Sequence, residues 1–277
     1  FYNGIWTSGK MPDVWRESIV VPILKIGKEK TAASSYRPIS LTSTLCKLME
    51  RLVKNRLAYF IESKSKLANI QSGFRKGRST IDHILRLSDH IGRGINTKRF
   101  TLAVFLDFTS AFDMLWHEKL LSKLQSFGVT GNCFAFVEQF LSGRSIKVRV
   151  GAETSEARDL DNGSPQGSIL SPLLFILSID DLLTKLRDVE SSLYADDASI
   201  YKSGRSIHRV YQTVQRNLNV VSAWCKQNGF ILSPTKTISV LFTRSKQKMP
   251  GPLQIDGKLI KMEKSARFLG VIFDSRL

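Results

Sequence analysis

Three aspartates stand at the ends of apolar, β-prone segments. Asp196 and Asp197 lie inside the stretch Leu193 to Ile200, and this pattern predicts a tight hairpin with carboxylates at its tip. Asp107 ends a nearly continuous apolar run that begins at Phe100, which is typical of a strand buried on both faces. Carboxylates gathered in one cleft raise one another's pKa unless a cation is bound. Because hard oxygen ligands favour Mg²⁺, Mn²⁺ or Ca²⁺ over zinc, the acids predict a divalent metal site.

Each acid also has a simpler explanation. Two adjacent aspartates are common in turns, since aspartate bonds its own backbone there. Asp107 could be the N-cap of a helix, because a periodic segment follows Ser110 to Asp113. Capping alone would not require the apolar strand before Asp107. A site of three carboxylates could instead hold two metal ions about 4 Å apart, which stabilise the attacking and leaving oxygens of a phosphoryl transfer.

Several short motifs accompany the acids in a fixed order along the chain. They are Ser35 to Leu41, Gln71 to Arg75 with Arg78 to Thr80, Leu106 to Phe108 with Ala111 to Asp113, Gly163 to Ser168 with Leu170 to Phe175, Tyr194 to Asp197, Lys236, and Phe268 to Gly270. Together they make the chain resemble the reverse transcriptase domain of non-LTR (LINE-like, jockey-type) retrotransposons, over nearly its whole length. One acidic pair is a weak signal, whereas this ordered set is a specific one.

The resemblance implies an α+β fold: a right-hand polymerase core of fingers and palm, with an antiparallel palm sheet backed by helices. It implies one reverse transcriptase domain over 1–277, with fingers over about 1–98 and palm with some fingers elements over 99–277. We expect no thumb, endonuclease or ribonuclease H in these residues.

The resemblance also assigns the catalytic residues. Asp107, Asp196 and Asp197 would be catalytic and would bind two Mg²⁺ ions, with Mn²⁺ as a possible substitute. Lys236 matches a lysine near the leaving pyrophosphate, which it could neutralise or protonate. A solvent-exposed lysine is the simpler alternative for Lys236.

Five further residues are expected to bind the nucleotide. Arg75 is the candidate contact to the triphosphate, in a glycine-flanked basic loop ahead of a helix. Gln166 would contact the sugar and base of the nucleotide, and Gly167 and Tyr194 belong to the same predicted site. Phe112 would lie under the sugar, where it crowds a 2′-hydroxyl and offers it no hydrogen bond. The alternatives are an ordinary surface loop for Arg75, an inert turn for Gln166 and core packing for Phe112.

The implied reaction extends a DNA primer on an RNA template with dNTPs. An RNA-templated RNA polymerase is the nearest rival, and Phe112 argues against it. Intron maturases and telomerase share the chemistry, although their motifs match less well. A rival of another class is a truncated, catalytically weak or inactive remnant that binds nucleic acid.

The composition agrees with a polyanionic partner. The chain has 41 Lys and Arg against 24 Asp and Glu, a net charge of +17, which is typical of proteins that bind nucleic acid or an anionic membrane. The three cysteines lie far apart without CxxC spacing, which argues against disulfides and zinc and suggests an intracellular location, nuclear or cytoplasmic. No apolar run is long enough to span a membrane, so we expect no membrane partner. The oligomeric state is left open.

The remaining pattern predicts the supporting elements. We expect an edge strand at 18–25 because of Pro22. An amphipathic helix is expected at 42–62, and its core-facing stripe contains Leu45, Leu48, Met49, Leu52, Leu57 and Phe60. Further expectations are a helix capped by Ser79 or Thr80, two helices in 118–142, a strand at 145–150, a helix opening at 168–171, a helix at 206–227, a strand at 238–242 and a hairpin at 253–260.

Overall fold

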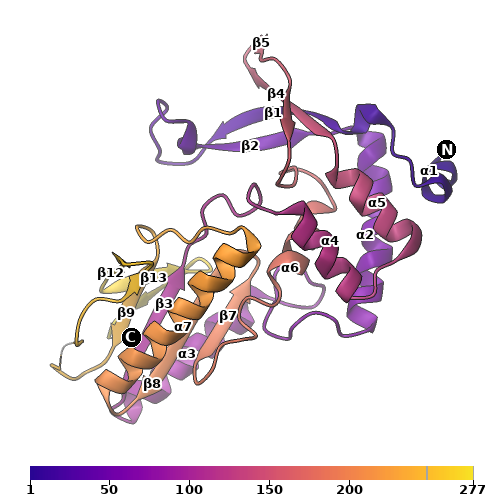
Figure 1. Cartoon of the computed structure of the whole chain (residues 1–277). Helices are drawn as coiled ribbons and strands as arrows, with labels where there is room; N and C mark the ends of the chain where they lie inside the picture. Colours follow the sequence, from indigo (N-terminus) through magenta and orange to yellow (C-terminus); the bar gives the residue numbers. More distant parts are fainter. Residues whose placement is uncertain (248, 277) are drawn as a thin grey trace. The chain divides into compact units, whose positions relative to one another are not determined.

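The computed structural model describes residues 1–247 and 249–276. The chain forms two compact units, each assembled from two separate stretches of sequence (Figure 1). Unit 1 contains Phe1–Leu67 and Phe112–Ser178, and unit 2 contains Ala68–Ala111 and Ile179–Leu277. Both units combine helices with largely antiparallel sheets, so the predicted α+β class is confirmed. The fingers boundary expected near residue 98 is a different division and stays a prediction.

A five-stranded sheet forms the centre of unit 2, in the order β12-β9-β3-β8-β7. Its strands are β3 (Phe100–Leu106), β7 (Glu190–Tyr194), β8 (Asp197–Gly204), β9 (Ile238–Phe242) and β12 (Lys261–Met262). The middle strand β3 pairs antiparallel with both β8 and β9, and every residue of β3 is buried. A strand with partners on both edges and cover on both faces exposes no side chain, which explains its continuous apolar run.

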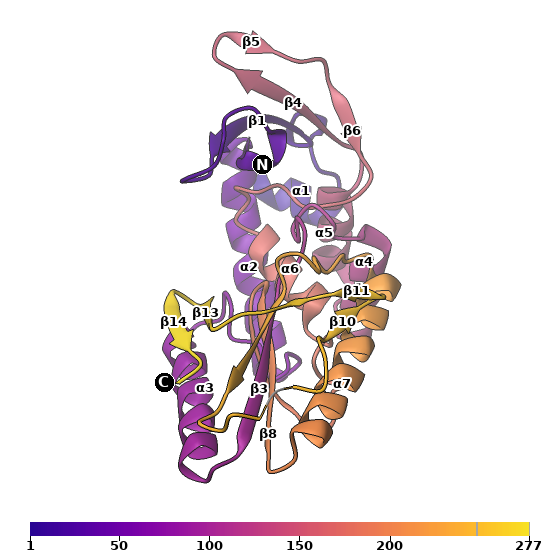
Figure 2. The ribbon, with the colours of Figure 1, turned by 90° about the vertical axis from the view of Figure 1, so that its left-hand side faces the viewer.

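Different elements cover the two faces of this sheet, as the turned view in Figure 2 shows. One face carries α3 (Thr80–Asn96) and the hairpin of β13 (Ser265–Phe268) and β14 (Val271–Asp274), while α7 (Ile207–Asn228) packs on the other. Helix α3 begins at a capping box built on Ser79, as predicted. The first face is one apolar cluster of Leu87, Ile91, Ile95, Ala103, Phe105, Tyr201, Val240, Phe242, Ala266, Phe268 and Phe273.

A small hairpin lies beside α7, formed by β10 (Gln254–Ile255) and β11 (Lys258–Leu259). Its two turn residues, Asp256 and Gly257, both have positive φ, at 50° and 77°. This backbone is what an Asp-Gly pair in a tight hairpin turn favours, so the predicted hairpin is confirmed. The carboxylate of Asp256 accepts hydrogen bonds from Ser222 and Lys226 on α7, both at 2.7 Å.

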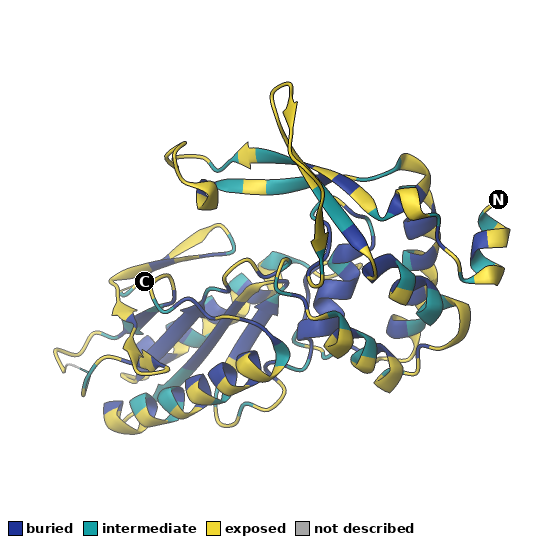
Figure 3. Cartoon of the chain, turned by 45° about the horizontal axis from the view of Figure 1, so that its top comes forward, coloured by how far each residue is buried: buried dark blue, intermediate teal, exposed yellow. Residues whose placement is uncertain are grey.

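Unit 1 is built on a second sheet, in which β2, β1, β4 and β5 are neighbours in that order and β6 pairs with β4. These strands are β1 (Glu17–Leu24), β2 (Tyr36–Leu41), β4 (Arg144–Val150), β5 (Glu153–Thr154) and β6 (Arg158–Leu160). The helices are α1 (Tyr2–Ser8), α2 (Thr44–Ser63), α4 (His117–Ser126), α5 (Gly131–Leu141) and α6 (Ser171–Ile179), with 3-10 turns at Asp13–Trp15 and Ala33–Ser35. The outer part of β4 and all of β5 are exposed, in contrast to the buried strands of unit 2 (Figure 3).

The prediction that 18–25 forms an edge strand is wrong. Strand β1 lies between β2 and β4. The pairing with β4 covers only Glu17 to Val20, however, whereas the pairing with β2 continues to Leu24. Pro22 therefore falls where β1 has a single neighbour, and its missing N–H interrupts no ladder.

The predicted core stripe of α2 is also wrong in part. Leu45, Leu48 and Leu52 are exposed, by 54%, 46% and 45%. The buried residues are Cys46, Met49, Glu50, Val53, Leu57 and Ile61. The helix carries two apolar stripes side by side, so periodicity alone could not tell which of them faces the core.

None of the helices in the described part of the chain has both the length and the apolar content that a membrane crossing requires.

Candidate functional site

The acidic hairpin predicted from the sequence is present in unit 2. Strands β7 and β8 pair antiparallel, and Tyr194 lies opposite Asp197. Ala195 and Asp196 form the turn between them, and Ala195 has a left-handed φ of 55°. The ring of Tyr194 also meets His83 edge-on, with centroids 6.1 Å apart. Both acids therefore stand at the tip of a hairpin whose strands are regular.

Asp107 is brought to the same end of the sheet by its position after β3. Leu106 lies opposite Ala198 in the pairing of β3 with β8. Continuing this antiparallel register by one residue places Asp107 at the level of Asp197. The alternative helix-cap role is not observed, because α4 begins at His117. The strands thus gather the three predicted acids, which were separated by about 90 residues in sequence.

The backbone of Asp107 is fixed on both sides by one loop. Its N–H donates to the Thr237 hydroxyl at 3.2 Å, and its carbonyl accepts from the Ser233 N–H at 2.9 Å. The same loop carries Lys236, whose Nζ lies 3.7 Å from Oδ1 of Asp107. That separation is an ion pair rather than a hydrogen bond, and the buried Oδ1 has no hydrogen-bond partner among the described residues.

The carboxylates perturb one another. Removal of water by surrounding protein raises the pKa of Asp197 to about 6, and the charges of Asp196 and Asp107 add to this rise. The pKa of Asp196 is raised for the same first reason, with a further contribution from Asp107 and an opposing one from its own backbone N–H. The site therefore favours any positive charge that approaches it.

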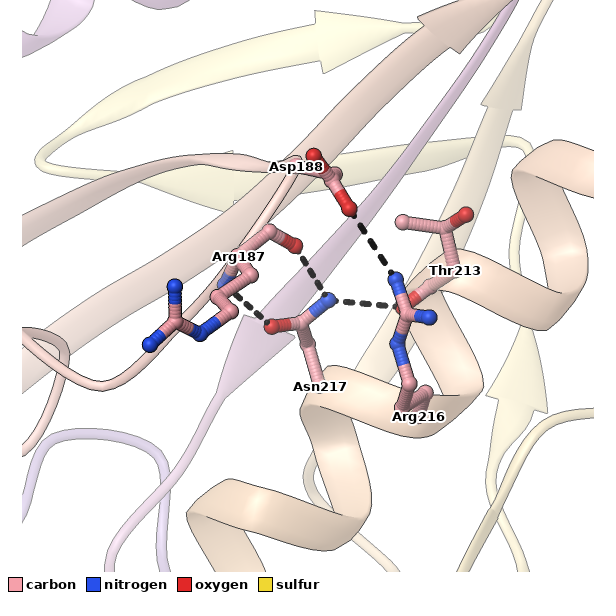
Figure 4. A network of polar contacts seen from close by, with 5 residues as sticks. All are labelled: Arg187, Asp188, Thr213, Arg216 and Asn217. Carbon is pink, nitrogen blue, oxygen red and sulfur yellow. Dashed lines mark hydrogen bonds and ion pairs between the residues drawn. The ribbon is translucent and has the colours of Figure 1, made fainter.

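The base of the hairpin is anchored to α7 by a polar network (Figure 4). The buried side chain of Asn217 accepts from the Arg187 N–H at 3.0 Å and donates to the carbonyls of Arg187 and Thr213 at 2.9 and 2.8 Å. Arg216 pairs with Asp188 at 3.2 Å. These contacts fix the segment immediately before β7, so the base of the hairpin is attached to α7.

Arg75 lies in a loop of unit 2 that it helps to hold. One guanidinium nitrogen, Nη1, donates to the carbonyl oxygens of Ala68 and Gln71, both at 2.9 Å. The Ala68 N–H in turn donates to the buried carboxylate of Asp180 at 3.0 Å. Arg75 therefore has a bracing role in addition to its predicted contact with triphosphate, which stays a prediction.

The glycine loop predicted to bind nucleotide belongs to unit 1. The Gln166 side chain donates through Nε2 to the carboxylate of Asp113 at 3.2 Å, and the Gln166 backbone carbonyl accepts from the Ser40 N–H at 2.7 Å. Gly167 has a φ of 128°, and a Cβ there would lie 2.6 Å from the Ser40 carbonyl oxygen. At the other end, the Gly163 carbonyl is hydrogen-bonded to the His117 ring at 2.7 Å. The loop is thus held residue by residue.

Phe112 also belongs to unit 1. Its ring stacks on Phe175 of α6, with centroids 4.4 Å apart and an angle of 22° between the planes. The stack supports the ring from one side and is compatible with both the packing role and the sugar-contact role considered above.

A family model for reverse transcriptase (RNA-dependent DNA polymerase) matches residues 26–273. The chain belongs to the reverse transcriptase family.

Curated relatives of this reverse transcriptase chain come from mobile elements. It is 34% identical over 284 residues to the probable RNA-directed DNA polymerase from transposon BS of Drosophila melanogaster. It is 29% identical over 283 residues to the RNA-directed DNA polymerase from mobile element jockey of the same species. Both alignments cover 100% of this chain and 31% of the relative, so the chain spans about a third of their length. The resemblance to jockey-type elements is confirmed.

A solved structure with a similar fold is apo telomerase from Candida tropicalis truncated from its C-terminal domain. It superposes with a TM-score of 0.63 at 12% identity, covering 96% of this chain and 55% of that one. At this identity the similarity concerns the fold alone, and it agrees with the predicted polymerase core of fingers and palm.

Reverse transcriptases generally use divalent metal ions, and the donor chemistry of the acidic site suits such ions. Three carboxylates are hard oxygen ligands, and Oδ1 of Asp107 is buried without a hydrogen bond. Within residues 1–247 and 249–276, however, no group of three or more His, Cys, Asp or Glu side chains is close enough together to hold a metal ion. Residue types and surroundings fit a cation, whereas a closed ligand cluster is not observed.

Two supporting residues of this reverse transcriptase chain were not recognised from the sequence. Gln71 is buried and contacts the acidic hairpin, although it lies 124 positions away from Ala195. Glu50 of α2 is fully buried and accepts from the N–H groups of Ile169 and Leu170 at 2.7 and 3.1 Å, where the chain enters α6. A lone acid within an apolar stripe was the available signal for Glu50, whereas Gln71 stood out only as the first residue of a family motif, which predicted no contact for it.

Proposed function

We propose that this chain is an RNA-directed DNA polymerase that extends a DNA primer on an RNA template with dNTPs. The observation that carries the proposal is the gathering of Asp107, Asp196 and Asp197 at one end of a buried sheet, with the pKa of the two hairpin acids raised. Membership of the reverse transcriptase family and the mobile-element relatives support the same reaction.

Asp107, Asp196 and Asp197 would hold two Mg²⁺ ions, or Mn²⁺ in their place. When bound, the ions lower the pKa of the primer 3′-hydroxyl and neutralise charge on the triphosphate. The chain's own contribution is rigidity, because strand pairing and the Ser233–Thr237 loop fix the backbone of the acids. Lys236 would place a positive charge or a proton near the leaving pyrophosphate.

Five residues would bind the nucleotide. Arg75 would contact the triphosphate, and Gln166 with Gly167 would meet the sugar and base. Phe112, backed by Phe175, would exclude a 2′-hydroxyl by crowding it. Tyr194 completes the proposed set.

The template and primer would be gripped mainly through phosphates. A net charge of +17 supports binding with little sequence specificity and a steep dependence on salt. A hybrid of RNA and DNA presents sugar and phosphate contacts across a shallow groove, which suits such binding.

Primer extension on an RNA template tests the proposal directly. With Mg²⁺ we expect incorporation of dNTPs but not NTPs, and no incorporation by the Asp196→Asn variant. Extension with NTPs instead would overturn the role given to Phe112. If no extension occurs at high enzyme and low salt while salt-sensitive binding to the hybrid is retained, the polymerase proposal is wrong. The chain would then be a protein that only binds nucleic acid.

A further inference from the structure

The tip of the acidic hairpin touches a second segment of unit 2, Gln71 to Gly73. The Oε1 atom of the Gln71 side chain accepts from two backbone N–H groups, those of Gly73 at 2.7 Å and Ala195 at 3.1 Å. The Ser72 N–H donates to the Leu193 carbonyl at 3.0 Å. The segment therefore contacts the hairpin through one side chain and one backbone bond.

This contact is closely packed. Gln71 has no exposed surface, and Ser72 and Ala195 are exposed by only 3% and 5%. A Cβ at Gly73 would lie 2.2 Å from the Ala195 nitrogen, so only glycine allows the segment to approach the turn this closely. Because two N–H groups point at the same side-chain oxygen, the amide of Gln71 has one possible orientation.

The position that Gln71 contacts is conformationally demanding. Ala195 has a φ of 55°, in the left-handed region that side chains other than glycine adopt at a cost. An N–H group in such a turn would be buried without a partner if Gln71 were absent, which disfavours the turn further. Asp196 follows Ala195 directly, so the direction of its carboxylate depends on this backbone.

We propose that Gln71 is a positioning residue for the metal-binding acids: its Oε1 holds the Ala195 turn and thereby sets the direction of Asp196. The inference rests on the proposed polymerase function and deepens it. Gln71 is fully buried and would act through the turn, not on the substrate itself. Its loss should weaken the binding of the metal ion more than the binding of primer and template, since only the former depends on the direction of the carboxylates.

The test compares Gln71→Met with Gln215→Met in the full chain. Met has nearly the length of Gln but cannot accept either N–H. Gln215 also accepts a backbone N–H, from Gln254 at 2.9 Å, but it links α7 to β10. We expect Gln71→Met to raise the Mg²⁺ concentration for half-maximal extension about tenfold, with an unchanged Kd for the hybrid and partial recovery of rate at high Mg²⁺. Gln215→Met should leave the Mg²⁺ dependence unchanged.

A double variant sharpens the test. Glycine adopts the left-handed turn without strain, so Ala195→Gly should make the site less dependent on Gln71. We expect Gln71→Met to shift the Mg²⁺ requirement less in the Ala195→Gly background than in the wild type. An equal shift in both backgrounds, or a Gln71→Met variant that loses thermal stability but keeps the wild-type Mg²⁺ curve, would sink the proposal.

Hydrogen exchange of the wild-type chain tests the contact without relying on a variant or on activity. The amides of Gly73 and Ala195 should exchange at least about a hundredfold more slowly than unstructured amides. Exchange of the Ala195 amide at the rate of an open turn would contradict the proposal. Failure of the wild type to extend primers while these amides remain protected would count against the polymerase function and not against the contact.

Discussion

The acidic hairpin of unit 2 and the glycine loop of unit 1 are held in different ways. The hairpin acids lie where the paired strands β7 and β8 meet, and the backbone of Asp107, which follows β3, is fixed by the Ser233–Thr237 loop. The loop from Gly163 to Gly167 has no strand, and individual contacts with His117, Asp113 and Ser40 fix it.

The side chains of the two regions differ in how far their polar atoms are already hydrogen-bonded. Oδ1 of Asp107 has no hydrogen bond among the described residues, and the pKa of Asp197 is raised to about 6. Gln166, in contrast, already donates to Asp113. A rigid backbone with an unsatisfied carboxylate oxygen is suited to a cation, whereas a loop in which the Gln166 side chain is already hydrogen-bonded is suited to fixing a shape. The variants below test this difference.

The largest effect is expected at Gly167, because the loop depends on close backbone approach. Gly167→Ala combines a disallowed φ with a contact to the Ser40 carbonyl, and should lower the free energy of unfolding by about 3 kcal/mol. The control is Gly151→Ala, at a positive φ with open space around it, which should cost about 1 kcal/mol. Thermal melts of both variants measure the difference, and equal losses would show that the approach to Ser40 is unimportant.

A smaller loss is expected for Glu50→Met. One carboxylate oxygen, Oε2, accepts two backbone N–H groups ahead of α6, and a Met side chain of similar length can accept neither. We expect the free energy of unfolding in denaturant to fall by about 2 kcal/mol. The exposed Glu153→Met variant in β5 is the control and should change little. A neutral result at Glu50 would mean that the entry to α6 is held by other contacts.

Phe112→Ala should affect choice of nucleotide more than stability. Removal of the ring opens space where a 2′-hydroxyl would lie, so discrimination between dNTPs and NTPs should fall about tenfold. Single-nucleotide incorporation measures the ratio of kcat/KM values. Phe175→Leu removes the stacking partner but keeps Phe112, and it should reduce discrimination less. Unchanged discrimination in Phe112→Ala would leave the ring with a packing role only.

The smallest effect concerns the protonation of Asp197. Its pKa lies at about 6 in the folded chain against a usual 3.8, so the folded state binds the proton more tightly between these values. The acid therefore lowers stability as pH rises from about 4 to about 6. Asp197→Asn should gain stability over the wild type across this range, by about 1 kcal/mol once solvent screening is allowed for. Urea unfolding at several pH values measures the difference in the free energy of unfolding between Asp197→Asn and the wild type. Added Mg²⁺ should make this difference smaller. A constant difference across the range would be evidence against a raised pKa.

Much of unit 2 could be predicted from sequence because its signals are local. The apolar run of β3 and the acids of the hairpin follow directly from residue order, and pairing then brings them together. The placement of Leu45 and Leu52 failed since α2 carries two apolar stripes, and only tertiary packing selects one of them. The contact of Gln71 with Ala195 could not be predicted, because a glutamine that bonds a distant backbone leaves no periodic trace.

The division of each unit into two stretches has a consequence for synthesis on the ribosome. Strand β3 is complete at Leu106, but β8 does not begin until Asp197 and β9 until Ile238. At roughly 5 to 20 residues per second, about 90 residues of further synthesis leave β3 unpaired for roughly 5 to 20 seconds. An apolar β-prone segment without a partner can pair with other chains during that time. The strand that makes the acidic site rigid is therefore also the segment of the nascent chain that a chaperone would most usefully protect.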